Sequence, residues 1–133
     1  KANEMSGRVR IAHGTYEASS LASGDVIEMF TLPDGARLLE GSLAHDALAS
    51  STTLSVGYAA HTNAAGTAVS AAAAAYKAAA ASTAAQKVDI LATLALGSGT
   101  ETDTDADGVI VTATMGGAAG TGTIEVTIKY VVD

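Results

Sequence analysis

The sequence predicts an all-β protein, a β-sandwich or jelly roll with one short alanine-rich helical insertion. About six to eight short segments are apolar or alternate apolar with polar residues, as strands do. Turn-forming residues separate them at intervals of about 8–15 residues, which is typical of sandwiches and barrels. The chain of 133 residues is long enough to bury its own core, and it contains no cysteine. We therefore expect an N-terminal arm over residues 1–6 and one domain over residues 7–133.

The first half of the chain contains four of the expected strands. Arg8 and Arg10 alternate with Val9 and Ile11, which predicts a half-buried strand with a basic outer face. A Leu-Pro-Asp-Gly sequence at residues 32–35 is typical of a tight turn, because proline presets φ and glycine accepts a positive φ. The other three strands are expected at residues 25–32, 36–48 and 54–58.

Alanine dominates the segment from residue 63 to residue 96, which we interpret as an insertion into the sandwich. Alanine has the highest helix propensity, and one helical stripe would hold Val69, Ala72, Tyr76 and Ala80. A short helix is therefore predicted near residues 68–81. Residues 87–94 favour a strand, because apolar and charged residues alternate there, although residues 92–96 would also suit a helical turn.

The C-terminal part predicts two further strands, at residues 109–115 and 124–132. The last strand is the clearest in the chain, because five alternate positions are apolar: Ile124, Val126, Ile128, Tyr130 and Val132. The glycine-rich residues 116–122 between the two strands are interpreted as a hairpin connection.

The composition disfavours several classes of partner. The chain carries 14 acidic and 7 basic residues, for a formal charge of -7, and an acidic surface repels the phosphate backbone of nucleic acids. Aromatic residues make up 4% of the chain, which also disfavours stacking on bases. No continuous stretch of bulky apolar residues is long enough to predict a transmembrane helix. We therefore expect neither a nucleic-acid nor a membrane partner.

Several segments resemble small structural proteins of tailed bacteriophages, in particular capsid decoration (cement) or head-associated proteins. The resemblance lies in GRVRI at 7–11, SGDVIEMF at 23–30, LPDGARLL at 32–39, TTLSVGY at 52–58 and TIEVTIKYV at 123–131. It covers most of the chain except the alanine-rich middle. Because these motifs are strands and turns, the resemblance implies a fold and a place of assembly, and no catalytic residue.

The resemblance implies a β-sandwich that is often trimeric and binds the outside of an icosahedral shell. The expected partners are the major capsid protein and further copies of the same chain as a homotrimer, located on the capsid surface of the virion. Small side chains suit such dry contacts, because they let backbones approach closely. The alternative is a receptor- or glycan-binding module of a tail or head fibre, which would display aromatic residues on exposed loops.

Three alternate carboxylates form the first half of a calcium-binding loop: Asp103, Asp105 and Asp107, followed by Gly108. The twelfth position of that motif, which needs a bidentate glutamate, is Thr114. A strand and not a helix is expected after the loop. Calcium binding therefore competes with the simpler interpretation of a solvated acidic loop.

The scarce arginines are candidate interface residues: Arg8, Arg10 and Arg37. They are expected either to pair across strands with Glu17, Glu28 or Glu40, or to meet acidic groups of a neighbouring subunit or of the shell.

No catalytic constellation is recognisable. Three widely spaced histidines, His13, His45 and His61, are interpreted as unrelated to one another, and the glycine-rich segment lacks the spacing of a dinucleotide-binding loop. The sequence therefore predicts a protein that is not an enzyme and needs no cofactor, calcium excepted.

Overall fold

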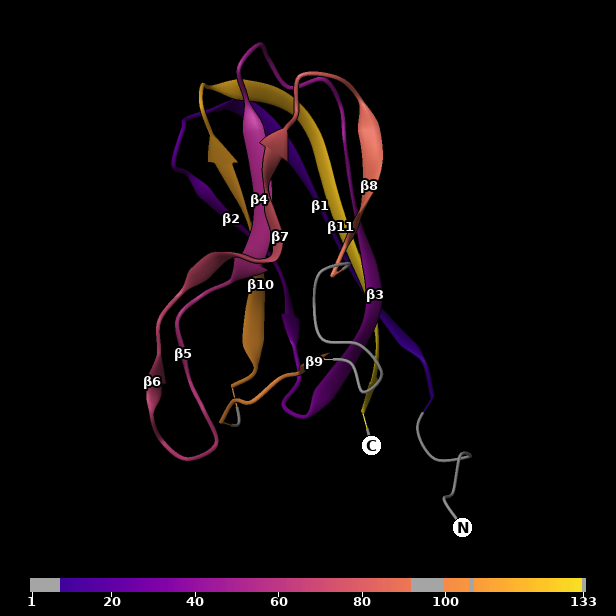
Figure 1. Cartoon of the computed structure of the whole chain (residues 1–133), viewed down its shortest axis with the longest axis vertical. Coiled ribbons are helices and arrows are strands. Elements are labelled where there is room, and N and C mark those ends of the chain that lie inside the picture. Colours follow the sequence, from indigo (N-terminus) through magenta and orange to yellow (C-terminus); the bar gives the residue numbers. More distant parts are fainter. Residues whose placement is uncertain (1–7, 92–99, 106, 133) are drawn as a thin grey trace.

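The chain folds almost entirely into β-strands (Figure 1). The computed structural model describes residues 8–91, 100–105 and 107–132, and no helix occurs among them, so none there could span a membrane. The all-β prediction is confirmed. The strands are β1 (Arg10–Leu21), β2 (Val26–Leu32), β3 (Ala36–His45), β4 (Thr53–Tyr58), β5 (His61–Thr62), β6 (Ala68–Val69), β7 (Ala72–Ala81), β8 (Gln86–Ile90), β9 (Thr100–Glu101), β10 (Val109–Gly116) and β11 (Gly120–Val132).

The strands form two main antiparallel sheets. Sheet A has the order β1-β11-β3-β8, with β9 also paired to β3, and sheet B has the order β2-β10-β4-β7. The short strands β5 and β6 pair with each other in a separate hairpin. Each sheet has one central pair of strands, and the pairs on either side of it join an early strand to a late one. These four pairs are nested along the chain: β1 with β11, β2 with β10, β3 with β8, and β4 with β7. Distant parts of the sequence therefore lie side by side throughout the fold.

One hydrophobic core joins the two sheets. Alternate residues of β11 point inward as the sequence predicts, and Ile124, Val126 and Ile128 are all fully buried. Val111 and Val56 contribute equally buried side chains from sheet B. Full burial of one such aliphatic side chain contributes about 1.5–3 kcal/mol relative to exposure. Because the core occupies the inner faces of both sheets, only their outer faces and edges can contact a partner.

The predicted helical insertion is wrong. Residues 72–81 form β7, which pairs with β4 at one edge of sheet B, and residues 86–90 form β8 at the edge of sheet A. Both are integral strands of the two sheets. The predicted strand from residue 87 is confirmed as far as residue 90, and residues 92–96 lie outside the described part of the chain. Helix propensity is a weak prior that tertiary packing overrides. Here Tyr76 is buried in the core from its position in β7.

The predicted hairpin at residues 116–122 is also wrong. β10 belongs to sheet B and β11 to sheet A, so this glycine-rich connection crosses from one sheet to the other. Gly117 has a φ of 80°, and a Cβ there would lie 1.9 Å from the carbonyl oxygen of Ser51. The predicted turn at residues 32–35 is confirmed, with Gly35 at a φ of 71°, and it too connects strands of different sheets, β2 and β3.

Candidate assembly surfaces

The segment that leads into β1, residues 8–11, exposes two large apolar side chains. Val9 is 58% and Ile11 is 62% exposed, so the predicted half-buried strand is wrong at this end. The face of β1 that continues the inner face of β11 instead carries three small residues, Ala12, Gly14 and Ala18, beside a Tyr16 that is 40% exposed. A Cβ on Gly14 would lie 2.6 Å from the carbonyl oxygen of Met29, so β1 approaches β2 through its backbone. We call residues 8–11 the lead segment.

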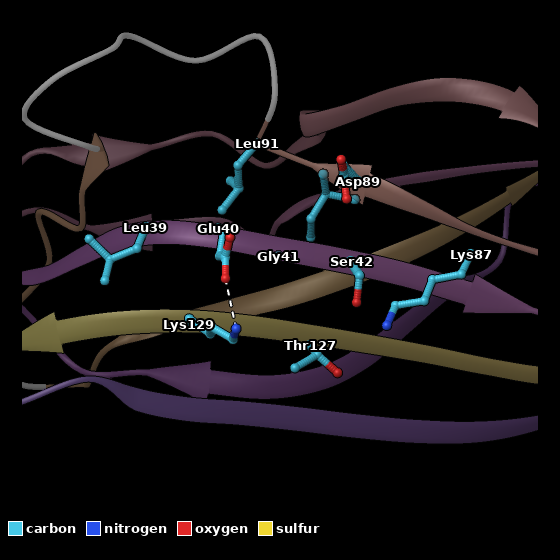
Figure 2. A pocket seen from close by; sticks show the side chains of 10 residues that line it. Leu39, Glu40, Gly41, Ser42, Lys87, Asp89, Leu91, Thr127 and Lys129 are labelled. Carbon is cyan, nitrogen blue, oxygen red and sulfur yellow. Dashed lines mark hydrogen bonds and ion pairs between the residues drawn. The ribbon is translucent and has the colours of Figure 1, made fainter.

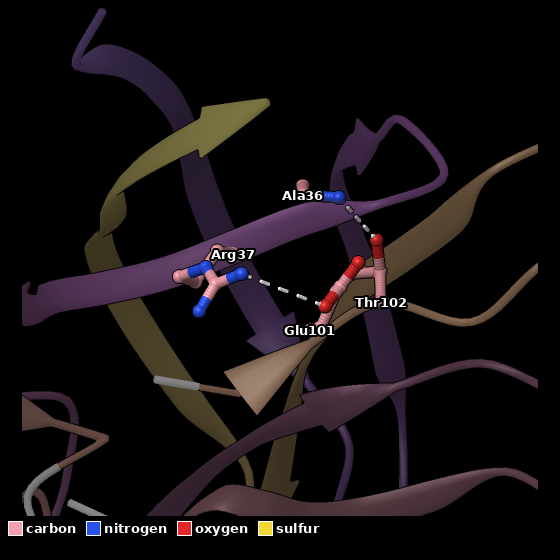
Figure 3. A network of polar contacts seen from close by, with 4 residues as sticks. All are labelled: Ala36, Arg37, Glu101 and Thr102. Carbon is pink, nitrogen blue, oxygen red and sulfur yellow. Dashed lines mark hydrogen bonds and ion pairs between the residues drawn. The ribbon is translucent and has the colours of Figure 1, made fainter. Parts of the chain in front are cut away.

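The predicted interface arginines have different surroundings. Arg8 and Arg10 are exposed, and neither forms an ion pair with any residue in the described part of the chain. Arg37 lies on β3, where its Nη2 atom is 3.9 Å from Oε2 of Glu101 (Figure 3). Thr102 anchors this region, because its hydroxyl accepts a hydrogen bond from the backbone N–H of Ala36 at 2.9 Å. Arg37 is therefore part of the contact between β3 and β9.

Of the predicted acidic partners, Glu17 and Glu40 have other neighbours. Glu17 accepts a hydrogen bond from the Thr123 hydroxyl, and Glu40 accepts one from Nζ of Lys129 at 2.7 Å. The hydrogen bond and charge of Lys129 lower the pKa of Glu40. This pair lies in an open hollow of about 410 Å³ on the outer face of sheet A (Figure 2). Exposed Leu39 lines the same hollow, so this face combines an apolar side chain with charges of both signs.

A more apolar groove of about 190 Å³ lies on the outer face of sheet B. We call it the sheet B groove; its lining residues include Val26, Glu28, Ala73, Thr112 and Thr114. Val26 is 56% exposed, although it is a large apolar side chain. The Oγ1 atom of Thr114 is buried without a hydrogen-bond partner among the described residues.

The groove results from an irregularity in β7. Tyr58 pairs with Ala72 while Val56 pairs with Lys77, so β7 contains extra residues opposite Gly57. A Cβ on Gly57 would lie 1.8 Å from the carbonyl oxygen of Ala72. β7 thus passes close to Gly57, and Ala73 of β7 with Ala71 just before it forms one wall of the groove. The sequence pattern does not indicate this surface, because an alanine-rich segment favours a helix.

A cluster of aromatic side chains lies near the β5–β6 hairpin. The ring centroids of Tyr58 and His61 are 5.3 Å apart, and those of Tyr58 and Tyr76 are 5.9 Å apart. Together with Glu101 and Asp103 they line a pocket of about 220 Å³. Burial, with a smaller contribution from Tyr58, raises the pKa of Tyr76 to about 12.

The acidic loop is tied to the β5–β6 hairpin. Asp103 accepts a hydrogen bond from the backbone N–H of Ala64 at 3.1 Å, and Asp105 accepts one from the backbone N–H of Asp107 at 2.9 Å. The backbone N–H of Asp105 in turn donates to the Thr62 carbonyl at 2.8 Å. The described ranges contain no group of three or more His, Cys, Asp or Glu side chains that could hold a metal ion. Calcium binding by Asp103, Asp105 and Asp107 stays a prediction.

The three histidines lie apart, each with local partners. The ring of His13 hydrogen-bonds the hydroxyls of Thr127 and Thr15, whereas Nδ1 of His45 and of His61 contacts a backbone carbonyl oxygen. They belong to β1, β3 and β5 respectively.

The fold is similar to chains in solved phage capsid structures. The chain aligns over its full length with 90% of a chain in the capsid of Ralstonia phage GP4, with a TM-score of 0.72 and 21% identity. It aligns likewise with 91% of a chain in the cyanophage Pam1 capsid asymmetric unit, with a TM-score of 0.69 and 19% identity. A third chain, from the acidic stable capsid of Helicobacter pylori bacteriophage KHP30, gives a TM-score of 0.55 at 17% identity, over 93% of this chain and 87% of that one.

These similarities show a shared fold, and they confirm at that level the predicted resemblance to phage structural proteins. No protein-family model matches the sequence, and no curated protein matches it significantly.

Proposed function

We propose that this chain is a non-enzymatic structural protein of a phage virion, which binds the outside of the capsid and stabilises it as a decoration (cement) protein. The observation that carries the proposal is the similarity of the whole chain to chains of phage capsid structures. The exposed apolar lead segment supports it, because large apolar side chains left in solvent are typical of a surface that a partner covers.

We also propose that the fold is a jelly roll and that the chain assembles as a homotrimer. The nested pairing of early with late strands, in one five-stranded and one four-stranded sheet, supports the jelly roll, which is common in viral capsid domains. Three copies around one axis would each contribute a contact with the major capsid protein, so that modest individual contacts add to a strong one.

The test is binding of the purified chain to capsids that lack it. The chain is expected to co-sediment with capsids of its own phage and to raise the temperature at which they release DNA. Immunogold labelling of complete particles is expected to mark heads evenly. Label on tails alone, or an absence of label, would refute the capsid-surface role.

The second candidate function is glycan or receptor binding. The specific observation in its favour is the pocket lined by Tyr58, His61 and Tyr76, since aromatic rings beside carboxylates can bind sugars. Saturation-transfer NMR with a panel of bacterial surface glycans tests it. Transfer to a sugar that Tyr58→Ala abolishes would favour this function over decoration.

A further inference from the structure

We propose that copies of this chain join through a contact in which the lead segment of one copy lies in the sheet B groove of the next. The inference deepens the proposed function, because it names the surfaces that would build the oligomer. It rests on the apolar character, the charges and the positions of the two surfaces.

The two surfaces are complementary in apolar character. The lead segment exposes Val9 and Ile11, and the groove exposes Val26 among alanine side chains. The groove volume of about 190 Å³ exceeds the roughly 150 Å³ of an engineered apolar cavity that accepts benzene, so it has room for an aliphatic side chain. Docking would remove these large apolar side chains from water.

The two surfaces are also complementary in charge. Arg8 and Arg10 have no ion-pair partner among the described residues, and neither has Glu28, which is exposed at the groove. Arg10 and Glu28 of different copies would therefore supply each other's missing partner. An ion pair at the rim of an apolar contact fixes the register of that contact.

The same pair is out of reach within one chain. β1 turns back into β2 through residues 22–25, so the two strands run in opposite directions, and Gly14 lies against Met29. Arg10 is four residues further from the turn than Gly14, while Glu28 is one residue nearer to it than Met29. At about 3.3 Å per residue, five residues separate them by roughly 16 Å along the strands. Pairing therefore requires a second copy.

The contact joins two different surfaces, so it is heterologous. Each copy offers one lead segment, on the edge strand of sheet A, and one groove, on the outer face of sheet B. A heterologous contact generates a closed ring when its rotation closes. In a ring of three copies every lead segment would fill a groove, so all lead segments and all grooves would be covered.

Charge reversal tests this contact in the full chain. The molar mass of the wild type, Arg10→Glu, Glu28→Arg and the combined variant is measured by size-exclusion chromatography with light scattering over a range of concentrations. Each single reversal is expected to raise the dissociation constant of the oligomer by more than about tenfold, and the combined variant to restore it. Mixing the two single variants is expected to restore association only in part, because a ring of three copies of two kinds keeps one contact between copies of the same kind, where like charges meet.

Lys87→Glu is the matched control for Arg10→Glu, because it changes the net charge by the same amount and in the same direction at an exposed position of β8. Thermal melts confirm that every variant folds, and Ile11→Gln provides a second, uncharged disruption of the same contact. A wild-type chain that is monomeric throughout, single variants that keep the wild-type mass, or a combined variant that fails to restore it would each overturn the inference.

Capsid co-sedimentation of the same variants separates this inference from the proposed function. An oligomer that follows the charge-reversal pattern but does not bind capsids would refute decoration and leave the contact standing. Single variants that keep the wild-type mass and bind capsids as the wild type does would refute the contact and leave decoration standing.

Discussion

A chain of two buried hydroxyl groups connects the β7–β8 loop to the segment before β4, and its removal gives a quantitative test of the fold. Ser82 Oγ donates to Thr52 Oγ1 at 2.9 Å, and Thr52 Oγ1 donates to the Ala49 carbonyl oxygen at 2.9 Å. Both side chains are essentially inaccessible, at 0% for Ser82 and 1% for Thr52. Water cannot replace a lost partner at such a position.

Thr52→Val preserves the shape of the side chain and removes its hydroxyl. The Ser82 hydroxyl then loses its acceptor and the Ala49 carbonyl loses a donor, and a buried unsatisfied polar group costs about 1–3 kcal/mol. For a chain of this size each kcal/mol lowers Tm by about 4 °C, so the expected fall in Tm is about 4–12 °C. Urea unfolding at a fixed protein concentration measures the free energy directly.

A double-mutant cycle separates the interaction from other effects of the substitutions. Once Ser82→Ala has removed the donor, Thr52→Val leaves no unsatisfied hydroxyl, so the two costs are expected to be less than additive by at least about 0.5 kcal/mol. Thr31→Val, at an exposed position of β2, is the control and is expected to change stability by less than about 0.5 kcal/mol. Additive costs, or a Thr52→Val variant as stable as this control, would show that the hydroxyl chain does not form.

Three further predictions concern single sites. The pKa of Tyr76 is raised to about 12, so its contribution to the free energy of unfolding is fully present below pH 10 and is lost as the pH rises to 12. The loss amounts to about 2–3 kcal/mol, and Tyr76→Phe should abolish it whereas Tyr16→Phe should not. Gly57→Ala should lower Tm more than Gly66→Ala, which meets no atom within 4 Å and adds only the strain of an alanine at a φ of 84°, and equal shifts would contradict the close crossing of β7. The calcium prediction requires that calcium raise Tm and that Asp105→Asn remove the rise; an unchanged Tm would refute it.

The sequence predicts the strands in which apolar and polar side chains alternate, but it does not predict the strand that consists mainly of small residues. In β11 the apolar residues at alternate positions, such as Val126, are buried, so composition and period were sufficient. In β7 the alanines bury little area, and the strand forms because Tyr76 enters the core and the backbone pairs with β4. That pairing joins distant residues, and a local propensity contains no information about it.

The candidate surfaces required the register as well as the strands. The sheet B groove depends on extra residues in β7 opposite Gly57, and no feature of an alanine run indicates where such an irregularity falls. The aromatic pocket likewise needs the hairpin that brings His61 to Tyr58. The arginines were identifiable because basic residues are rare in this chain, but their partners were not, since those depend on which strands are neighbours.

β1 and β11 show how one alternating pattern leads to opposite outcomes. In β11 the bulky residues face the core, whereas in β1 the same face holds the small residues Ala12, Gly14 and Ala18 and a Tyr16 that is 40% exposed, and bulky Ile11 faces outward. Gly14 has to be small because the backbone of β2 lies against it. An alternating strand whose inner face carries small residues has its larger apolar area on the outside. In the contact proposed above, a second chain would bury that area, so the size of the residues on the opposite face, and not the alternation alone, makes β1 a candidate for an assembly contact.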